Sequence, residues 1–283
     1  EATSDNPLVQ RFFRWELSWS GLAHLLRDEA EVDAALMAMN ELLMSDDQSI
    51  YTNRLVGGNG AASERATVVR RLVRVVGNVA DPARAGSAMA TACLLLTSTA
   101  GTEAMKVEFL GSGLLHHVLG WMSDVNASDQ ILEFSVDLIS ELIHNFRPWY
   151  TLILESAAFL KALLARWRMP TTILRVRNKI AGVFWTLVQV APVDDAEIGT
   201  GNFLGPLNDL VRDLLAAGAE LLVDHPNSHE DAGYHVYAVD LIHELVKSEH
   251  ALVRDLLDVG GVPILLDAFY DAPDDDRVKI LMV

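Results

Sequence analysis

The sequence contains a single cysteine, Cys93, among its 283 residues. One cysteine excludes a disulfide framework within the chain and any metal site made only of cysteines, and it is typical of a reducing compartment. Basic side chains are also scarce, since 22 lysines and arginines stand against 39 acids and give a formal net charge of −17. Contacts with nucleic-acid phosphates require a basic surface, so this charge argues against general nucleic-acid binding. Because a single cysteine fits a reducing compartment, we expect a cytoplasmic protein.

Long hydrophobic runs are absent as well. The most apolar stretch, Ala181–Val193, has 13 residues and includes Gln189, whereas a transmembrane helix needs about 20. Hydrophobic residues nevertheless make up 51% of the chain and charged residues only 22%, which is typical of a folded protein with a sizeable core. The sequence begins at Glu1 and ends at Val283, inside an apolar helix-like segment. We therefore expect a fragment of a longer protein.

The charge is unevenly distributed along the chain. Residues 194–283 contain 19 acidic and 5 basic side chains, whereas residues 1–193 contain 20 and 17. No acid occurs between Glu155 and Asp194, but six basic residues do: Lys161, Arg166, Arg168, Arg175, Arg177 and Lys179. This basic stretch predicts a site for an acidic peptide, a phosphorylated segment or an anionic head group. The alternative is that it pairs internally with the acidic C-terminal third.

Alternating strand-like patterns are missing, and hydrophobic residues recur instead with helical periodicity. Two segments place them on one helical face: Ile131, Phe134, Leu138, Leu142 and Asn145 in one, and Ile173, Val176, Ile180, Phe184 and Leu187 in the other. The breaks between such segments are short and rich in Gly, Pro, Asp, Asn and Ser, which end or cap helices. The sequence predicts an all-α fold.

The helical segments also repeat. Val136–Leu142 and Val239–Leu245 agree at six of seven positions, 103 residues apart. Equivalent leucines lie at spacings of 54, 46, 45 and 58 residues: Leu42, Leu96, Leu142, Leu187 and Leu245. The two longer spacings coincide with predicted loop inserts at 57–62, 194–202 and 224–228. A period near 45 residues with loop insertions is typical of a helical solenoid.

Each repeat has the same internal order. A short helix at 104–110 is followed by Gly111-Ser112-Gly113, a second helix at 114–122, and a long third helix that begins after Ser128 and runs through Asn145. The same order reappears as 251–257, Gly260-Gly261 and 262–269, with the third helix expected from Arg277 onward. The order resembles the armadillo repeat, in which a glycine permits the sharp turn between the first two helices.

The resemblance covers most of the chain and implies a right-handed α-solenoid of about five irregular armadillo-like three-helix repeats, as a single domain over residues 1–283. HEAT-like packing stays open for the N-terminal third. The resemblance also implies a non-enzymatic scaffold or adaptor that binds an extended or helical partner segment in a concave groove. Two alternatives remain: an armadillo-type chaperone cofactor, and the substrate-recruiting arm of a large enzyme such as a HECT-type ubiquitin ligase.

No pattern of catalytic or metal-binding residues stands out. Gly57-Gly58-Asn59-Gly60 lacks the Lys-Ser/Thr of a phosphate-binding loop. His243-Glu244 begins a string like that of zinc proteases, but Lys247 occupies the place of the second histidine. We therefore expect no enzymatic activity, no cofactor and no metal.

The third helices of armadillo solenoids line the groove, so their polar faces are the predicted partner-binding residues. Helical phase opposite the hydrophobic face selects Glu133, Asp137, Ser140, Glu141 and His144 on the third repeat, Arg175, Asn178, Lys179, Gly182, Trp185 and Gln189 on the fourth, and Asp240, His243, Glu244 and Lys247 on the fifth. This groove would be acidic, then basic and aromatic, then acidic, which could fix the register of a complementary partner.

Trp185 has two interpretations. Asn178, Trp185 and Gln189 share one narrow sector of the fourth third-helix. An amide can bond a partner's backbone, and an indole beside it can cover the aliphatic part of a partner side chain. The alternative is that Trp185 packs under a neighbouring repeat.

Overall fold

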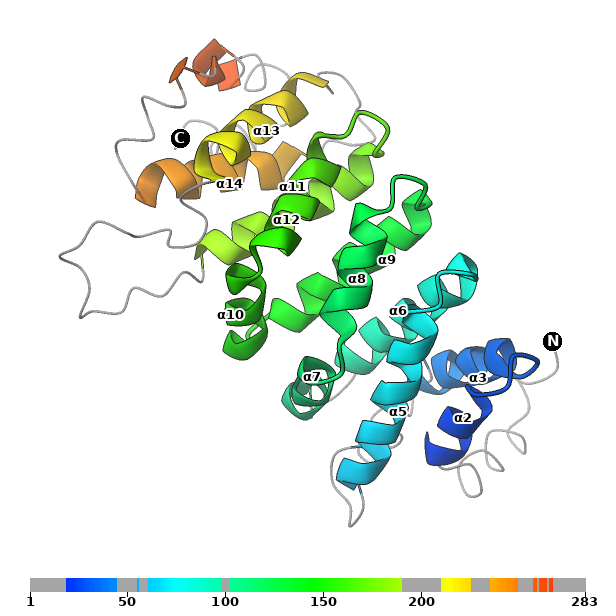
Figure 1. Ribbon diagram of the computed structural model, residues 1–283. Helices are drawn as coiled ribbons and strands as arrows, with labels where there is room; N and C mark the ends of the chain where they lie inside the picture. Colours follow the sequence, from blue (N-terminus) through cyan, green and yellow to red (C-terminus); the bar gives the residue numbers. More distant parts are fainter. Residues whose placement is uncertain are drawn as a thin grey trace. The chain divides into compact units, whose positions relative to one another are not determined.

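The computed structural model describes residues 19–44, 55, 61–97, 102–189, 210–224, 235–248, 257–258, 260–263 and 265–266. These residues form helices and turns without a strand, and this confirms the all-α prediction (Figure 1). The predicted inserts lie outside the described residues except at their edges, where Ala61 and Ala62 belong to one helix and Asp224 ends another.

The chain divides into two units, Glu1–Trp149 and Tyr150–Val283, which we describe separately. The expectation of one continuous domain stays a prediction. The described helices of the first unit are α2 (Trp19–Leu25), α3 (Val32–Met44), α5 (Ala61–Val76), α6 (Pro82–Thr97), α7 (Thr102–Leu110), α8 (Leu114–Ser123) and α9 (Asp129–Ile143). After α10 (Arg147–Glu155), which begins at the end of the first unit, the second unit contains α11 (Ala157–Arg168), α12 (Leu174–Gln189), α13 (Val211–Asp224) and α14 (His235–Ser248).

Helices with the same place in successive repeats pack against each other. The third helices α3, α6 and α9 contact one another in sequence within the first unit, and so do the second helices α2, α5 and α8. In the second unit, α12 contacts α14 and α11 contacts α13. Because each repeat buries its apolar face against the next one, the core runs continuously within each unit.

The repeat period is visible in the hydrogen bonds between repeats, which join residues 43 to 52 positions apart. Two buried indoles show the pattern. The Nε1 of Trp121 on α8 donates to the carbonyl of Val76 at 2.8 Å, and the Nε1 of Trp149 donates to the carbonyl of Lys106, also at 2.8 Å. These bonds satisfy polar groups that would otherwise be buried without a partner.

The predicted core leucines of the last four repeats, Leu96, Leu142, Leu187 and Leu245, are all buried. In α3, however, the buried residue is Leu43, and Leu42 is only half-buried. The placement of Asn145 on the hydrophobic face of α9 was wrong. The helix ends at Ile143, and Asn145 is exposed with φ 53°, a left-handed conformation that asparagine tolerates just beyond a helix end.

The glycine turn between the first two helices is confirmed. Gly113, at the N-cap of α8, has φ 82°, and Gly260 has φ 72°. A residue with a Cβ rarely adopts such a backbone φ, so these positions favour glycine. The turn brings α8 alongside α9, whose N-cap Ser128 accepts a hydrogen bond from the Ile131 amide.

Candidate functional site

The predicted polar stripe on α9 is only partly open to solvent. Glu133, Asp137, Ser140 and Glu141 are half-buried. His144 is exposed and caps the C-terminal end of the helix, where its carbonyl accepts a hydrogen bond from the buried ammonium of Lys106. This end of the stripe therefore has a structural role in the first unit.

On α12 the predicted stripe divides into open and closed positions. Arg175 and Gln189 are exposed, while Lys179, Gly182 and Trp185 are half-buried. Placing Asn178 on this open face was wrong, because Asn178 is only 4% exposed. The buried arc of α12 is wider than the hydrophobic pattern suggests, since the helix packs against both α11 and α14.

The burial of Asn178 leaves one polar atom without a partner. Its Oδ1 accepts no hydrogen bond, although a buried amide oxygen normally finds a donor. This acceptor lies one turn from Gly182 and two turns from Trp185 along α12.

Trp185 lies against the neighbouring repeat and keeps part of its surface exposed. Its ring centroid is 5.9 Å from that of Tyr237 on α14, with the two planes tilted by 48°, and Tyr237 is 37% exposed. The Tyr237 ring packs over Gly182, where an added Cβ would lie 3.5 Å from the ring, at an ordinary van der Waals distance. Trp185 therefore belongs neither to a closed core nor to a fully open face.

The sequence analysis missed Tyr237, although a signal was available. The match of Val136–Leu142 with Val239–Leu245, continued two residues upstream, pairs Phe134 with Tyr237. Phe134 covers Gly86 on α6 much as Tyr237 covers Gly182, because a Cβ on Gly86 would lie 3.3 Å from the Phe134 ring. Each contact joins the third helices of two successive repeats.

The remaining predicted residues lie on α14. Asp240, His243 and Glu244 are half-buried, and His243 Nδ1 lies 3.7 Å from Glu244 Oε1. Lys247 lies on the same helix, but its side chain is outside the described part of the chain. The structure thus brings the aromatic pair and the polar residues of α12 and α14 together within the second unit.

The prediction of one basic surface over residues 161–179 was wrong. Arg166 and Arg177 are buried, and the Nε of Arg177 donates to the carbonyl of Trp167 at 3.0 Å. Arg168 pairs with Asp213 at 3.4 Å and with Glu220 at 2.9 Å, which agrees with internal pairing to the acidic C-terminal third. Lys161 and Arg175 are exposed, and Lys179 is half-buried.

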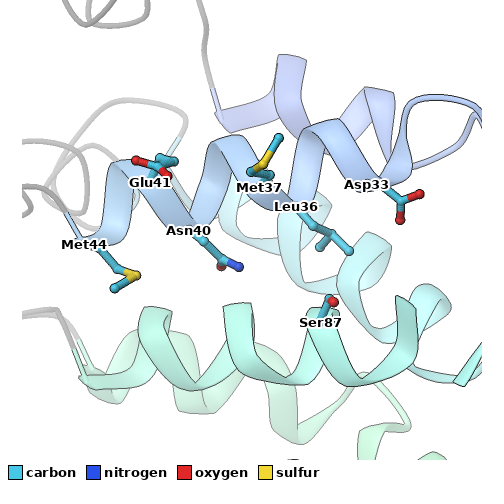
Figure 2. Close-up of a pocket in the computed structure, with 7 residues that line it drawn as sticks. All are labelled: Asp33, Leu36, Met37, Asn40, Glu41, Met44 and Ser87. Carbon is cyan, nitrogen blue, oxygen red and sulfur yellow. The ribbon is translucent and has the colours of Figure 1, made fainter. Parts of the chain in front are cut away.

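A pocket in the first unit was not predicted. It has a volume of about 220 Å³ and lies between α3 and α6, the third helices of the first two repeats (Figure 2). Its lining residues are Asp33, Leu36, Met37, Asn40, Glu41, Met44 and Ser87. Helical phase gave no signal for it, because exposed methionines in an apolar helix look like core residues in the sequence.

Among the described residues, no group of three or more His, Cys, Asp or Glu side chains is placed to hold a metal ion. No helix in that part of the chain is long and apolar enough to cross a membrane.

Comparison with solved structures identifies the fold. A crystal structure of computationally designed armadillo repeat proteins for modular peptide recognition contains a chain that superposes with a TM-score of 0.68, at 16% identity over 94% of this chain and 98% of that one. A designed armadillo repeat protein in complex with the peptide (KR)4 gives a TM-score of 0.68, at 15% identity over the same shares. No protein family and no curated protein matches the sequence. The chain therefore has an armadillo-like solenoid fold, as the sequence pattern predicted.

Proposed function

We propose that this chain is a non-enzymatic, peptide-binding scaffold that holds an extended partner segment against its third helices. The observation that carries the proposal is the Trp185–Tyr237 pair, which leaves two aromatic rings partly exposed where α12 packs on α14. Aromatic side chains at such a position provide a large contact area with little loss of conformational entropy. Two structural neighbours support this reading, one designed for modular peptide recognition and one in complex with the peptide (KR)4.

The chemistry around the pair suits a peptide. The exposed amide of Gln189, one turn beyond Trp185, can donate to and accept from a partner backbone. Arg175 and Lys179 supply positive charge on α12, and Asp240 and Glu244 supply negative charge on α14. A partner whose charges alternate in the complementary order would be held in one register.

The test begins with the selection of random twelve-residue peptides on the immobilised chain. Binding of the enriched peptides is then measured by fluorescence anisotropy for the wild type, Trp185→Ala and Tyr237→Ala. We expect each substitution to weaken binding by about tenfold, in the range for truncation of an aromatic contact residue. Lys161→Ala is the matched control, because Lys161 is exposed on α11, outside the third helices.

Thermal unfolding of the same variants separates a contact role of the two rings from a structural one. Because both rings are only partly buried, we expect Trp185→Ala and Tyr237→Ala to leave the second unit folded. Two results would contradict the proposal. One is that no peptide is enriched above the blank surface. The other is that both aromatic variants bind the enriched peptides as tightly as the wild type.

A further inference from the structure

The pocket between α3 and α6 combines a buried floor with an exposed, flexible wall. Leu36 is 2% exposed and forms the floor, whereas Met44 is 74% exposed and Met37 is 59% exposed. In Figure 2, Leu36, Asn40 and Met44 extend from α3 toward α6, and Met37 and Glu41 project from the other edge of α3. Unbranched thioethers adapt to apolar groups of different shapes, so this wall suits an inserted apolar side chain.

The volume of the pocket limits what can enter it. At about 220 Å³, it is smaller than the roughly 300–1,000 Å³ of sites that enclose drug-sized ligands or cofactors. It can accept one or two side chains of a peptide. Burial of the two exposed methionines under such a peptide removes apolar surface from water and favours binding.

The charge at the rim of the pocket determines which peptide residue can lie next to the inserted apolar side chain. Asp33 is already compensated, because Arg84 donates from Nε to Oδ1 at 3.0 Å and from Nη2 to Oδ2 at 2.9 Å. Glu41 is exposed and forms no ion pair with any described residue, and Arg84 is the only base on α3 or α6. An uncompensated carboxylate beside an apolar pocket attracts a lysine or an arginine.

A polar group inside the pocket can orient the peptide backbone. Thr91 is fully buried, and its Oγ1 lies 2.7 Å from the amide oxygen of Asn40. This contact fixes the Asn40 side chain, whose Nδ2 has no hydrogen-bond partner among the described residues. The free N–H groups can donate to a carbonyl of a peptide that crosses the helices.

From these four features we infer that the pocket is a second peptide subsite, specific for an apolar side chain followed directly by lysine or arginine. The apolar side chain lies against Leu36 and Met44, and the cation meets Glu41. This inference rests on the proposed function. It adds a sequence preference of the partner peptide, at a site on α3 and α6 that is distant in sequence from Trp185.

The experiment uses fluorescein-labelled eight-residue peptides of Gly and Ala with a central Leu-Lys, Ser-Lys or Leu-Glu pair. Fluorescence anisotropy measures their affinity for the wild-type chain, Met44→Gln, Glu41→Gln and Glu41→Lys. Both positions are exposed, so the variants should fold, and circular dichroism checks this. Glu103→Gln and Val107→Gln are the matched controls, since they alter an exposed acid and an exposed apolar residue one turn apart on α7 of the same unit.

We expect the wild type to bind the Leu-Lys peptide about tenfold more tightly than either comparison peptide. Met44→Gln and Glu41→Gln should each lose most of that preference, Glu41→Lys should favour Leu-Glu, and the α7 variants should behave like the wild type. If the peptides selected on the immobilised chain bind through Trp185 but none of the three pocket variants changes any affinity, the subsite is overturned and the scaffold function stands. If no peptide binds the wild type at all, both are overturned.

Discussion

The ammonium group of Lys106 donates a hydrogen bond to the main-chain carbonyl of His144, at the C-terminal end of α9. Lys106 is only 4% exposed, and its own carbonyl accepts the indole N–H of Trp149 at 2.8 Å. One residue of α7 thus ties together the end of α9 and the beginning of α10. Burial lowers the pKa of Lys106, and the carboxylate of Glu141 opposes that shift.

Replacement of this buried cation should destabilise the first unit. Lys106→Met keeps an unbranched side chain, one atom shorter, but removes the donor to the His144 carbonyl, so we expect a loss of about 1–3 kcal/mol in the free energy of unfolding. Urea unfolding followed by circular dichroism measures it, with Lys161→Met on the surface of α11 as the control. Equal stability of Lys106→Met and the wild type would show that the cost of burying the charge cancels the bond.

Two fully buried tryptophans should respond differently to the same substitution. The indole N–H of Trp149 is bonded to the Lys106 carbonyl, whereas that of Trp167, which stacks on Phe184 with ring centroids 5.9 Å apart, has no partner. Both Trp→Phe changes remove similar volume, but only Trp149→Phe leaves a carbonyl unsatisfied. We therefore expect Trp149→Phe to be less stable than Trp167→Phe by about 1–3 kcal/mol in chemical denaturation. The reverse order would contradict the assigned bonds.

Acidification should weaken the first unit through His117 on α8. Its ring lies against Gly77, where an added Cβ would come within 2.5 Å of the imidazole. Burial, and secondarily the charge of His116, lowers the pKa of His117 below its usual value of about 6.5. As the pH falls, His117 therefore takes up a proton in the unfolded chain before it does so in the folded chain. The folded state loses stability as the pH falls from about 6.5, the pKa in the unfolded chain, to the lowered pKa in the folded chain.

The measurement compares the free energy of unfolding at pH 7.5 and pH 5 in the wild type and in His117→Gln. We expect a smaller pH dependence in His117→Gln, because the group that titrates has been removed. Val107→Gln, at an exposed apolar position on α7, is the control and should keep the wild-type slope. Parallel profiles for wild type and His117→Gln would exclude His117 as the source.

Much of the fold could be predicted from the sequence because its determinants are local. The second helix predicted at 114–122 is observed as Leu114–Ser123, and the turn before it depends on a glycine that can adopt φ 82°. The hydrophobic period of each helix selects the side that faces its own repeat, so Leu138, Leu142 and Leu187 were correctly placed in the core. Ile173, also placed there, lies just before α12 and is 40% exposed. The recurrence of these local signals defined the solenoid.

The sequence by itself determined the helices, their order and their repeat near 45 residues. Only the tertiary structure decided which polar residues remain open, because that depends on neighbouring repeats more than 40 positions away. Asn178 is buried on α12, which packs against both α11 and α14, and the packing on α14 brings Tyr237 beside Trp185. Packing of α3 on α6 leaves Met37 and Met44 at the edge of a pocket, although their helical pattern resembles that of a core. Helical phase fixes the direction of a side chain relative to its own axis, but the contacts between repeats determine what that side chain meets.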